Sequence, residues 1–427
     1  MTQDVVVCGA GVGGLACARA LERLGLTVLV LDRQRAHSGV AKGELLQPES
    51  VRILDGLAAL PGLLGRGAVP VSRLAIRDPA GRPLLCLDYD LVPGEYRQIL
   101  SADYPAVLSA LADSLGPGTE VRRGALVTGV LRDARGRVAG VTVMQDGRPR
   151  DVRAALVIAA DGLSSRLRKA AGLRARRRPY DHRLLAFELT GAEVDPEVSA
   201  YRTDRGLRLA YPLPHGRARL YVQVRPEEVR ADLRADPARW CDRLLAEMPA
   251  LAPLAGALRA SLAGRQVLGV YRLAVPKLTV PGLALAGEAA HAVHPMAAQG
   301  MNSSLADADA LAGQVAAAGS TEPGALDQAL QGYQQARSGR LAHTATVSHN
   351  AARMLTVTGG LGQVLGRRMM RHTAANSRLL QATAANLAGV GVHPLSLADR
   401  LYQLGLLTDP HRDGRPALRD SVRDGAR

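Results

Sequence analysis

The first 32 residues constrain the fold of this chain more than any other stretch. From residue 4 they read DVVVCGAGVGGLACARALERLGLTVLVLD, which is an apolar strand, a glycine-rich turn, an amphipathic helix and a second apolar strand ending at Asp32. A βαβ unit of this kind predicts a largely parallel sheet with helices packed on its faces. We therefore expect an α/β fold that begins with a Rossmann-like unit.

The glycines of this turn have the spacing of a dinucleotide-binding site. Gly9 permits the tight turn, Gly11 lets the backbone approach a pyrophosphate, and Gly14 allows the helix to pack closely on the strand. The helix N-terminus would stabilise the phosphate charge, and Asp32 would bind ribose hydroxyls. The alternative interpretation is a glycine turn without a ligand in a doubly wound fold.

Length and pattern divide the rest of the chain. At 427 residues, 47% of them apolar, the chain suits two or three domains. Apolar and polar positions alternate over residues 121–144, which predicts a small β-meander. Longer strand patterns between about 180 and 275 indicate an inserted sheet domain. We predict a discontinuous nucleotide-binding domain (1–75, 100–178 and 276–345), a substrate domain (76–99 and 179–275), a helical C-terminal region (346–408) and a disordered tail (409–427).

Composition disfavours several classes of protein. Neither a signal peptide nor a transmembrane run is recognisable, so we expect a cytoplasmic protein. The four cysteines lack metal-ligand spacing, which argues against a disulfide framework and a zinc site. The formal charge of +15 comes mainly from arginine in a chain with one Phe and one Trp, so a solvated basic surface is favoured over nucleic-acid binding.

A second loop, GEAAHAVHPMAAQGMN (287–302), follows an apolar strand and opens a helix. The backbone amides of Gly300, Met301 and Asn302 would lie at that helix N-terminus, where an anion is stabilised. His291 and His294 have neither a third histidine nor paired cysteines beside them. We therefore expect no metal site and favour histidines packed within the loop.

Three motifs in this order resemble the single-component FAD-dependent aromatic hydroxylases and their ubiquinone-hydroxylase and squalene-epoxidase relatives. The motifs are GAGVGG with Asp32, Asp161–Gly162, and Gly287–Glu288, and the resemblance covers most of residues 1–345. It implies a set of FAD-binding residues: Gly9, Gly11, Gly13, Gly14, Asp32, Arg33, Lys42, Asp161, Gly287, Glu288, Pro295, Gly300, Met301 and Asn302.

The resemblance also implies roles for the second loop. Glu288 would reach the ribityl chain, Pro295 would shape the wall beside the isoalloxazine, and the amides of residues 300–302 would stabilise negative charge at flavin N1 and O2. Two departures from the family pattern bear on how tightly FAD is held. Glu288 replaces the usual aspartate, and Ser101 stands where relatives often carry an arginine or glutamine.

The stretch KGELLQPESVRIL (42–54) is similar to the squalene-epoxidase version of this family segment. Lys42 would stand where many relatives place an arginine near the pyrophosphate. An ordinary helix start, with Gln47–Pro48 as its N-terminal signal, is the alternative interpretation.

RARLYVQV (217–224) resembles a substrate-domain strand of the 4-hydroxybenzoate hydroxylases. Arg219 would face the flavin and Tyr221 would lie near the substrate, whereas ordinary alternating strand residues are the alternative. Tyr211–Pro212–Leu213 stands where those enzymes carry a Ser-x-Arg clamp for a carboxylate. The missing clamp favours a larger, lipophilic substrate, and the pocket candidates are Tyr211, Arg219, Tyr221, His294 and Pro295.

The chain carries no second GxGxxG, and the family implies that NAD(P)H reduces the flavin transiently. A flavin C4a-hydroperoxide formed from O2 would then give one oxygen atom to the substrate, which we expect to be an aromatic or polyketide secondary metabolite. Epoxidation of an alkene and FAD-dependent reduction of an isoprenoid double bond are the alternatives. A halogenase is disfavoured by the lack of a Trp-x-Trp-x-Ile-Pro segment. The least favoured alternative is a non-enzymatic binding protein that keeps flavin as a structural element. No side chain is assigned as a catalytic base.

The segment MLTVTGGLGQVLGRRMMRH (354–372) mixes apolar residues with arginines. Such a pattern could lie on a membrane surface, but its glycines weaken an interfacial helix. We expect it to pack against the FAD domain or a dimer partner instead, in a protein that is a monomer or a homodimer.

Overall fold

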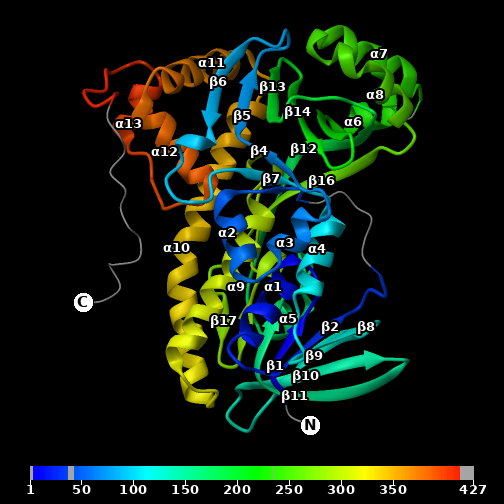
Figure 1. The fold of residues 1–427 in the computed structure, drawn as a ribbon, viewed down its shortest axis with the longest axis vertical. Helices are drawn as coiled ribbons and strands as arrows, with labels where there is room; N and C mark the ends of the chain where they lie inside the picture. The colour runs from blue at the N-terminus through cyan, green and yellow to red at the C-terminus, as the bar shows by residue number, and fades with distance from the viewer. Residues whose placement is uncertain (1–2, 37–42, 234, 414–427) are drawn as a thin grey trace.

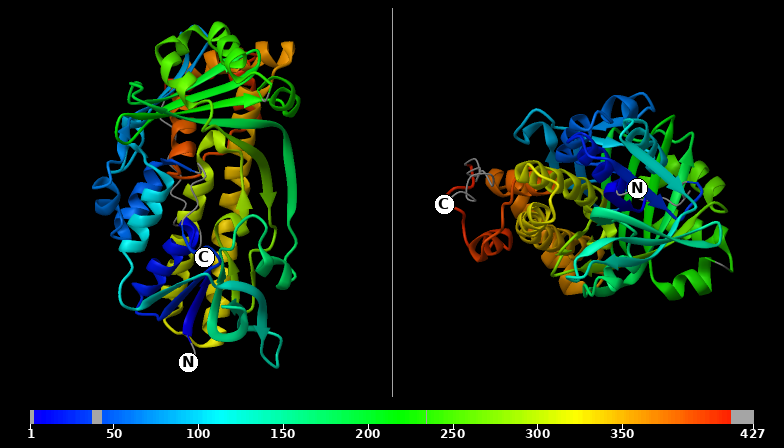
Figure 2. Two further views of the ribbon diagram at one scale, coloured as in Figure 1. Left: turned by 90° about the vertical axis from the view of Figure 1, so that its right-hand side faces the viewer. Right: turned by 90° about the horizontal axis from the view of Figure 1, so that it is seen from below.

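Two large β-sheets lie at opposite ends of an elongated molecule and are joined along its length by long helices (Figures 1 and 2). The computed structural model describes residues 3–36, 43–233 and 235–413. The α/β fold expected from the sequence is confirmed, with a Rossmann-like unit, a second sheet and a helical C-terminal region.

The first sheet is built on the predicted βαβ unit. Its strands run in the order β17–β18–β11–β1–β2–β8, and β1 pairs in parallel with both β2 and β11. The strands are β1 (Gln3–Cys8), β2 (Val28–Asp32), β8 (Thr119–Arg123), β9 (Leu126–Arg132), β10 (Val138–Gln145), β11 (Arg148–Ala159), β17 (Thr279–Val280) and β18 (Leu283–Leu285).

The predicted meander over residues 121–144 is only partly correct. β9, β10 and β11 do form an antiparallel set, but β8 is paired in parallel with β2 and extends the main sheet. Val121 lies opposite Val30 in that pairing, so the apolar alternation of this stretch serves the parallel sheet.

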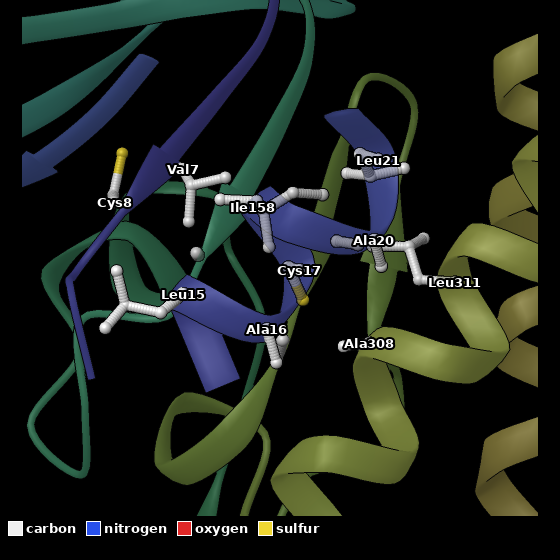
Figure 3. Close-up of a cluster of buried hydrophobic side chains, with 14 of the residues drawn as sticks. Val7, Cys8, Leu15, Ala16, Cys17, Ala20, Leu21, Ile158, Ala308 and Leu311 are labelled. Carbon is white, nitrogen blue, oxygen red and sulfur yellow. The ribbon is translucent and has the colours of Figure 1, made fainter. Parts of the chain in front are cut away.

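Helix α1 (Val12–Glu22) packs between the first sheet and α9 (Gln299–Ala318), as Figure 3 shows. Its inner face consists of small and branched apolar residues, and Leu15, Ala16 and Cys17 have no exposed surface. Leu311 of α9 is equally buried. The small side chains of α1 let the two helices approach closely, and this core fixes the end of α1 that follows the glycine turn.

The second sheet has the order β19–β16–β12–β15–β14–β13–β5–β6. Neighbours are antiparallel except β13 and β5, which are parallel. The strands are β5 (Arg73–Arg77), β6 (Pro83–Asp88), β12 (Arg176–Thr190), β13 (Glu197–Thr203), β14 (Gly206–Leu213), β15 (Arg217–Val224), β16 (Gln266–Ala274) and β19 (His291–Ala292).

Different elements cover the two faces of the second sheet. α7 (Pro237–Glu247) and α8 (Ala255–Ser261) cover one face, where Phe187 stacks on Trp240 with 5.9 Å between ring centroids. The other face packs on the C-terminal helices and on the short 3-10 helix η5 (Pro295–Ala297). The loop after β18 therefore reaches from the first sheet to the second.

A small third sheet and its neighbouring helices lie between the two large sheets. The sheet has the order β3–β7–β4, formed by Leu45–Leu46, Ile99–Ser101 and Val69–Val71. The helices are α2 (Pro48–Gly56), α3 (Leu60–Leu64) and α4 (Tyr104–Asp113). The remaining short elements are η1 (Tyr89–Leu91), α5 (Arg166–Ala170), α6 (Pro226–Glu228), η2 (Val229–Leu233), η3 (Pro249–Leu254) and η4 (Gly287–Ala289).

The C-terminal region is helical, as predicted. It comprises α10 (Pro323–Thr356), α11 (Gly360–Ala374), α12 (Ser377–Ala388) and α13 (Leu397–Gln403). α11 packs on β6 of the second sheet and not on the nucleotide-binding part, so the FAD-domain alternative for residues 354–372 is wrong, whereas the dimer alternative stays a prediction. The fully buried Arg202 of β13 explains this docking, because its guanidinium donates to the carbonyl oxygens of Met354, Gly362 and Gln363 at 2.7, 3.0 and 3.0 Å.

The predicted start of the tail at residue 409 is too early. Asp409 is buried and accepts hydrogen bonds from Asn376 (2.8 Å) and from Arg378 (2.7 and 2.9 Å). Residues 414–427 lie outside the described residues. In the parts of the chain that are described, no helix combines the length and apolar character needed to cross a membrane.

Candidate functional site

The glycine turn after β1 has the close contacts that the sequence predicted. Gly9 has φ +114°, and a Cβ atom there would lie 2.3 Å from the carbonyl oxygen of Ala160. A Cβ at Gly14 would lie 1.8 Å from the carbonyl oxygen of Gly9. These positions admit only glycine, because backbone atoms already occupy the space of a side chain.

Gly11 differs from Gly9 and Gly14 because a side chain built there would face open space. Among the described residues, only the hydroxyl of Tyr104 lies within 4 Å of a Cβ built at Gly11, at 3.8 Å. Gly11 is also the N-cap of α1, and no described side chain caps that helix. The turn therefore presents uncapped backbone amides to an open space, as an anion site requires.

Asp32 is fixed at the end of β2 beside this turn. Its Oδ2 accepts a hydrogen bond from the amide of Ala10, and its Oδ1 accepts one from the amide of Gln34, both at 2.6 Å. Arg33 follows it and is exposed. The carboxylate and the glycine turn are thus held together, in the arrangement expected for a nucleotide.

The carboxylate of Asp161, a predicted FAD-binding residue, has partners within the chain. It accepts hydrogen bonds from Ser165 and from the amide of Arg166 (2.7 Å), at the N-terminus of α5. What reaches the glycine turn is the backbone, since Gly9 lies against Ala160 and the amide of Asp161. The side chain of Asp161 therefore stabilises α5, while its backbone packs on the turn.

Gly13 and Gly287 bring the two predicted loops together. A Cβ at Gly13 would lie 3.3 Å from the Cβ of Ser304 and 3.4 Å from the Cα of Gly287, and Gly287 itself has φ +62°. Gly287 follows β18, and the same loop continues to β19 in the second sheet. The two candidate halves of the nucleotide site are therefore in direct contact.

A buried carboxylate that the sequence analysis did not single out holds this second loop. Asp307 of α9 accepts hydrogen bonds from the amide of Gly287 (2.9 Å) and from Nε of Arg337 (2.8 Å), and its Oδ2 lies 2.8 Å from Nε2 of His291. Burial opposes ionisation, but Arg337 and His291 hold the pKa of Asp307 below its usual value. His291 is thus a partner of Asp307 within the loop, and the described residues contain no cluster that could hold a metal ion.

Tyr104 is a second residue that the sequence analysis missed. It begins α4, and its hydroxyl lies 3.8 Å from a Cβ atom built at Gly11, near the open N-terminus of α1. Burial, with the charges of Glu288 and Asp32, raises the pKa of Tyr104 to about 12. Tyr104, Asp32 and the exposed Glu288 therefore surround the glycine turn. A tyrosine before a proline gave no sequence signal for this position.

The N-terminus of α9 is also uncapped by the described side chains. Ala298 precedes the helix in the left-handed conformation (φ +50°), and nothing described lies within 4 Å of a Cβ built at Gly300. Asn302 has another partner, because its side chain accepts from the amide of Gln47 (2.8 Å) and donates to the carbonyl of Leu45 (3.2 Å). Met301 packs against Gly43. The predicted Lys42 lies outside the described residues.

The pocket candidates Tyr211, Arg219 and Tyr221 lie together on one face of the second sheet. Tyr211 is opposite Arg219 in the pairing of β14 with β15, and the rings of the two tyrosines are 6.3 Å apart. Both tyrosines are buried in an apolar cluster that includes Met296 and Ala297, which follow the predicted Pro295. The strand and the second loop therefore meet in this cluster.

Glu44 joins this group and was not predicted. Nε and Nη2 of Arg219 donate to its carboxylate at 2.9 and 2.6 Å, and the hydroxyl of Tyr211 donates to it at 2.8 Å. Burial raises the pKa of Tyr211 well above its usual value, and the neighbouring charge of Glu44 adds to this effect. Tyr211 therefore acts as a hydrogen-bond donor.

A cavity of about 580 Å³ opens beside this ion pair. Glu44 and Arg219 line it together with the start of α4 and the end of the β14–β15 hairpin. The other lining residues are Gly65, Arg66, Asp103, Tyr104, Pro105, Ala106, Glu188, His215, Arg217 and Gln266. Tyr104 belongs both to this lining and to the surroundings of the glycine turn. The cavity therefore lies beside the predicted substrate strand and shares Tyr104 with the surroundings of the glycine turn.

His294 is fully buried, and its ring has a defined protonation. Nδ1 accepts the amide of Met296 at 3.1 Å, so the proton must be on Nε2, which lies 2.9 Å from Nε2 of His182. Burial lowers the pKa of His294 to about 3, with contributions from His182 and His349. The ring of Tyr180 packs edge-on against His294, with 4.8 Å between the ring centroids. The hydroxyl of Tyr180 lies 3.2 Å from Nδ1 of His349. His294 is therefore a neutral hydrogen-bond donor.

A glycine turn that opens onto an uncapped helix, with a ribose-type carboxylate beside it, defines a dinucleotide-binding fold. Residues 2–348 match the FAD binding domain family, and the chain belongs to this family. The protein is an FAD-dependent monooxygenase.

Two curated relatives and one solved structure illustrate the similarity. The chain is 30% identical over 308 residues to 6-methylpretetramide 4-monooxygenase of Streptomyces rimosus, covering 71% of this chain and 73% of that one. It is 30% identical over 363 residues to digeranylgeranylglycerophospholipid reductase 1 of Methanopyrus kandleri, covering 83% and 91%. The crystal structure of PqsL, a probable FAD-dependent monooxygenase from Pseudomonas aeruginosa, is similar with a TM-score of 0.74 at 27% identity, covering 83% and 97%.

Proposed function

We propose that the protein uses FAD, NAD(P)H and O2 to hydroxylate a fairly large, lipophilic aromatic substrate. The observation that carries this proposal is the cavity lined by Tyr104 and the Glu44–Arg219 pair, since Tyr104 also approaches the glycine turn and Arg219 belongs to the predicted substrate strand. The similarity to a monooxygenase that acts on 6-methylpretetramide supports the same substrate class. The first sheet and its helices would hold FAD, and the second sheet would hold the substrate.

The residues present fit FAD. The open amides of α1 beside Gly11 would bind its pyrophosphate, Asp32 its ribose, and Glu288 its ribityl chain. The uncapped amides at Gly300 and Met301 would stabilise negative charge on its ring, and Pro295 would form part of the ring's wall. When bound, FAD supplies the redox chemistry by which one atom of O2 reaches a substrate.

This chain's own residues would bind and orient the substrate and exclude water. Tyr211 and Tyr221 form an apolar wall with Met296 and Ala297, which removes water from that side of the second sheet. Tyr211 directs its proton to Glu44, and His294 directs its proton to His182. Both protons are thus held in place by partners, and the described side chains include no assigned catalytic base.

The test uses the purified protein with added FAD. We expect a flavin spectrum, and we expect large uncharged phenols to stimulate NAD(P)H oxidation with equivalent O2 uptake and a product that contains one added oxygen atom. Mass spectrometry with isotopically labelled O2 identifies the source of that atom. A chain that does not bind FAD, or that oxidises NAD(P)H only to release peroxide with every phenol tested, would contradict the proposal.

The similarity to the Methanopyrus kandleri reductase favours a second candidate, the reduction of an isoprenoid double bond. This reaction consumes reductant without O2. Substrate-dependent flavin reoxidation under strictly anaerobic conditions would therefore establish the reductase, and O2 uptake coupled to product would exclude it. The same polyprenyl and phenolic substrates serve for both measurements.

A further inference from the structure

The arginines that line the cavity are all engaged by carboxylates. Arg66 forms an ion pair with Asp113, and Arg217 with Asp103 (2.5 Å) and Glu188 (3.0 Å). Arg219 pairs with Glu44 (2.6 Å) and approaches Glu188 (3.2 Å). Among the described lining residues, three arginines face three carboxylates, so the formal charge of these side chains cancels.

Arg219 is the most deeply buried of these cations. Its side chain is 5% exposed and that of Glu44 is 2% exposed, whereas the side chains of Arg66 and Arg217 are 36% and 20% exposed. Two nitrogen atoms of the guanidinium donate to the same carboxylate, which is the strong, directional geometry of an arginine that recognises an acid. Glu44 therefore occupies the position that a carboxylate of a ligand would need to reach Arg219.

The backbone fixes Glu44 in this position. Its carbonyl oxygen accepts a hydrogen bond from the amide of Ala102 at 2.8 Å. The side chain of Asn302 donates to the carbonyl oxygen of Leu45 and accepts from the amide of Gln47. The hydroxyl of Tyr211 adds a hydrogen bond to the carboxylate. A ligand cannot displace Glu44 without leaving a buried charge and a buried hydroxyl without partners, which is unfavourable.

We propose that Glu44 determines specificity by occupying the guanidinium of Arg219, so that the cavity rejects substrates with a carboxylate and accepts their uncharged counterparts. The inference rests on the proposed function, since it concerns the substrate of the same site. The fixed carboxylate of Glu44 repels a ligand carboxylate, and the guanidinium of Arg219 is already paired and cannot compensate for this repulsion. The missing clamp at Tyr211–Leu213 and the presence of Glu44 act in the same direction.

The test measures equilibrium binding to the FAD-loaded protein without reductant, by calorimetry and by the change in flavin absorbance. The ligands are 4-hydroxybenzoate and its neutral isostere 4-hydroxybenzamide. In the unaltered protein we expect the benzamide to bind at least about tenfold more tightly than the benzoate. Glu44→Gln removes the negative charge and leaves the guanidinium of Arg219 without a carboxylate, so we expect benzoate binding to tighten about tenfold or more and benzamide binding to change by less than about threefold.

The double variant Glu44→Gln/Arg219→Gln is the matched control and should lose the gained affinity for benzoate. Benzoate binding that equals benzamide binding in the unaltered protein would overturn the proposal, and so would failure of both ligands to bind to either protein. A gain that survives in the double variant would do the same, because it would arise elsewhere. No outcome depends on turnover, so failure of the proposed reaction remains distinguishable.

Discussion

Replacing Asp307 should destabilise the protein far more than replacing a neighbouring aspartate of the same helix. Asp307 is fully buried and serves Arg337, His291 and the amide of Gly287. In Asp307→Ala the guanidinium of Arg337, whose side chain is 5% exposed, loses its carboxylate. The amide of Gly287 loses its acceptor as well.

The magnitude follows from these two losses. Breaking a buried ion pair by removing one partner costs about 3–5 kcal/mol. An unsatisfied buried amide costs about 1–3 kcal/mol, and the two terms overlap because they share one carboxylate. We therefore expect a loss of about 4–5 kcal/mol, a large part of the roughly 5–15 kcal/mol that stabilises a typical domain.

Urea unfolding followed by far-UV circular dichroism measures this loss, and Asp309→Ala is the control. Asp309 also lies on α9, but its side chain is 49% exposed and its partner Arg52 is 44% exposed, so its ion pair contributes at most about 1 kcal/mol. If Asp307→Ala costs no more than Asp309→Ala, the buried network does not hold the loop and the reasoning fails. Asp307→Asn, which keeps an oxygen acceptor, should have an intermediate effect.

Three further predictions concern the cofactor loop and the buried histidine. Gly11→Val should fold but fail to bind FAD in a fluorescence titration, because its side chain enters the open space that the pyrophosphate would occupy. Gly14→Val should not fold, because its Cβ meets a carbonyl oxygen at 1.8 Å. A Gly11→Val protein that binds FAD normally would show that the pyrophosphate lies elsewhere. Glu288→Ala should weaken FAD binding about tenfold or more with unchanged thermal stability, as expected for a lost charge-assisted hydrogen bond of about 1.5–3 kcal/mol, and equal FAD affinity would argue against a ribityl contact. The pKa of His294 is near 6.5 in the unfolded chain and about 3 in the folded chain, so the free energy of unfolding should decrease as the pH falls through this window. The decrease should be smaller by a few kcal/mol in His294→Gln but not in the exposed control His411→Gln. Identical pH profiles of the two variants would contradict the buried neutral state.

The sequence predicted those parts of the site that depend on neighbouring residues. The glycine spacing, Asp32 and the alternating strand around Tyr221 are local patterns, because a turn or a strand imposes its own periodicity on nearby side chains. The contact between Gly13 and Gly287 was also foreseeable, since both loops follow strands of one parallel sheet.

The missed residues depend on distant segments of the chain. Glu44 and Arg219 are separated by 175 positions, and a lone glutamate in GELLQP carries no sign of its buried partner. The docking of α11 on the second sheet was not predicted, for the same reason. Its mixture of apolar residues and arginines showed that it needed a partner but not which sheet would provide one.

The buried guanidinium of Arg202 has a practical consequence for anyone who trims this protein. The family match ends at residue 348, yet the carbonyl groups that receive Arg202 belong to Met354, Gly362 and Gln363. A chain shortened to the matched region would keep the cation and lose these acceptors, and the sheet face now covered by α11 and α12 would be exposed to solvent. The homology boundary is therefore a poor place to cut, and the shortest autonomous unit should extend at least through Asp409, which anchors Arg378 and Asn376.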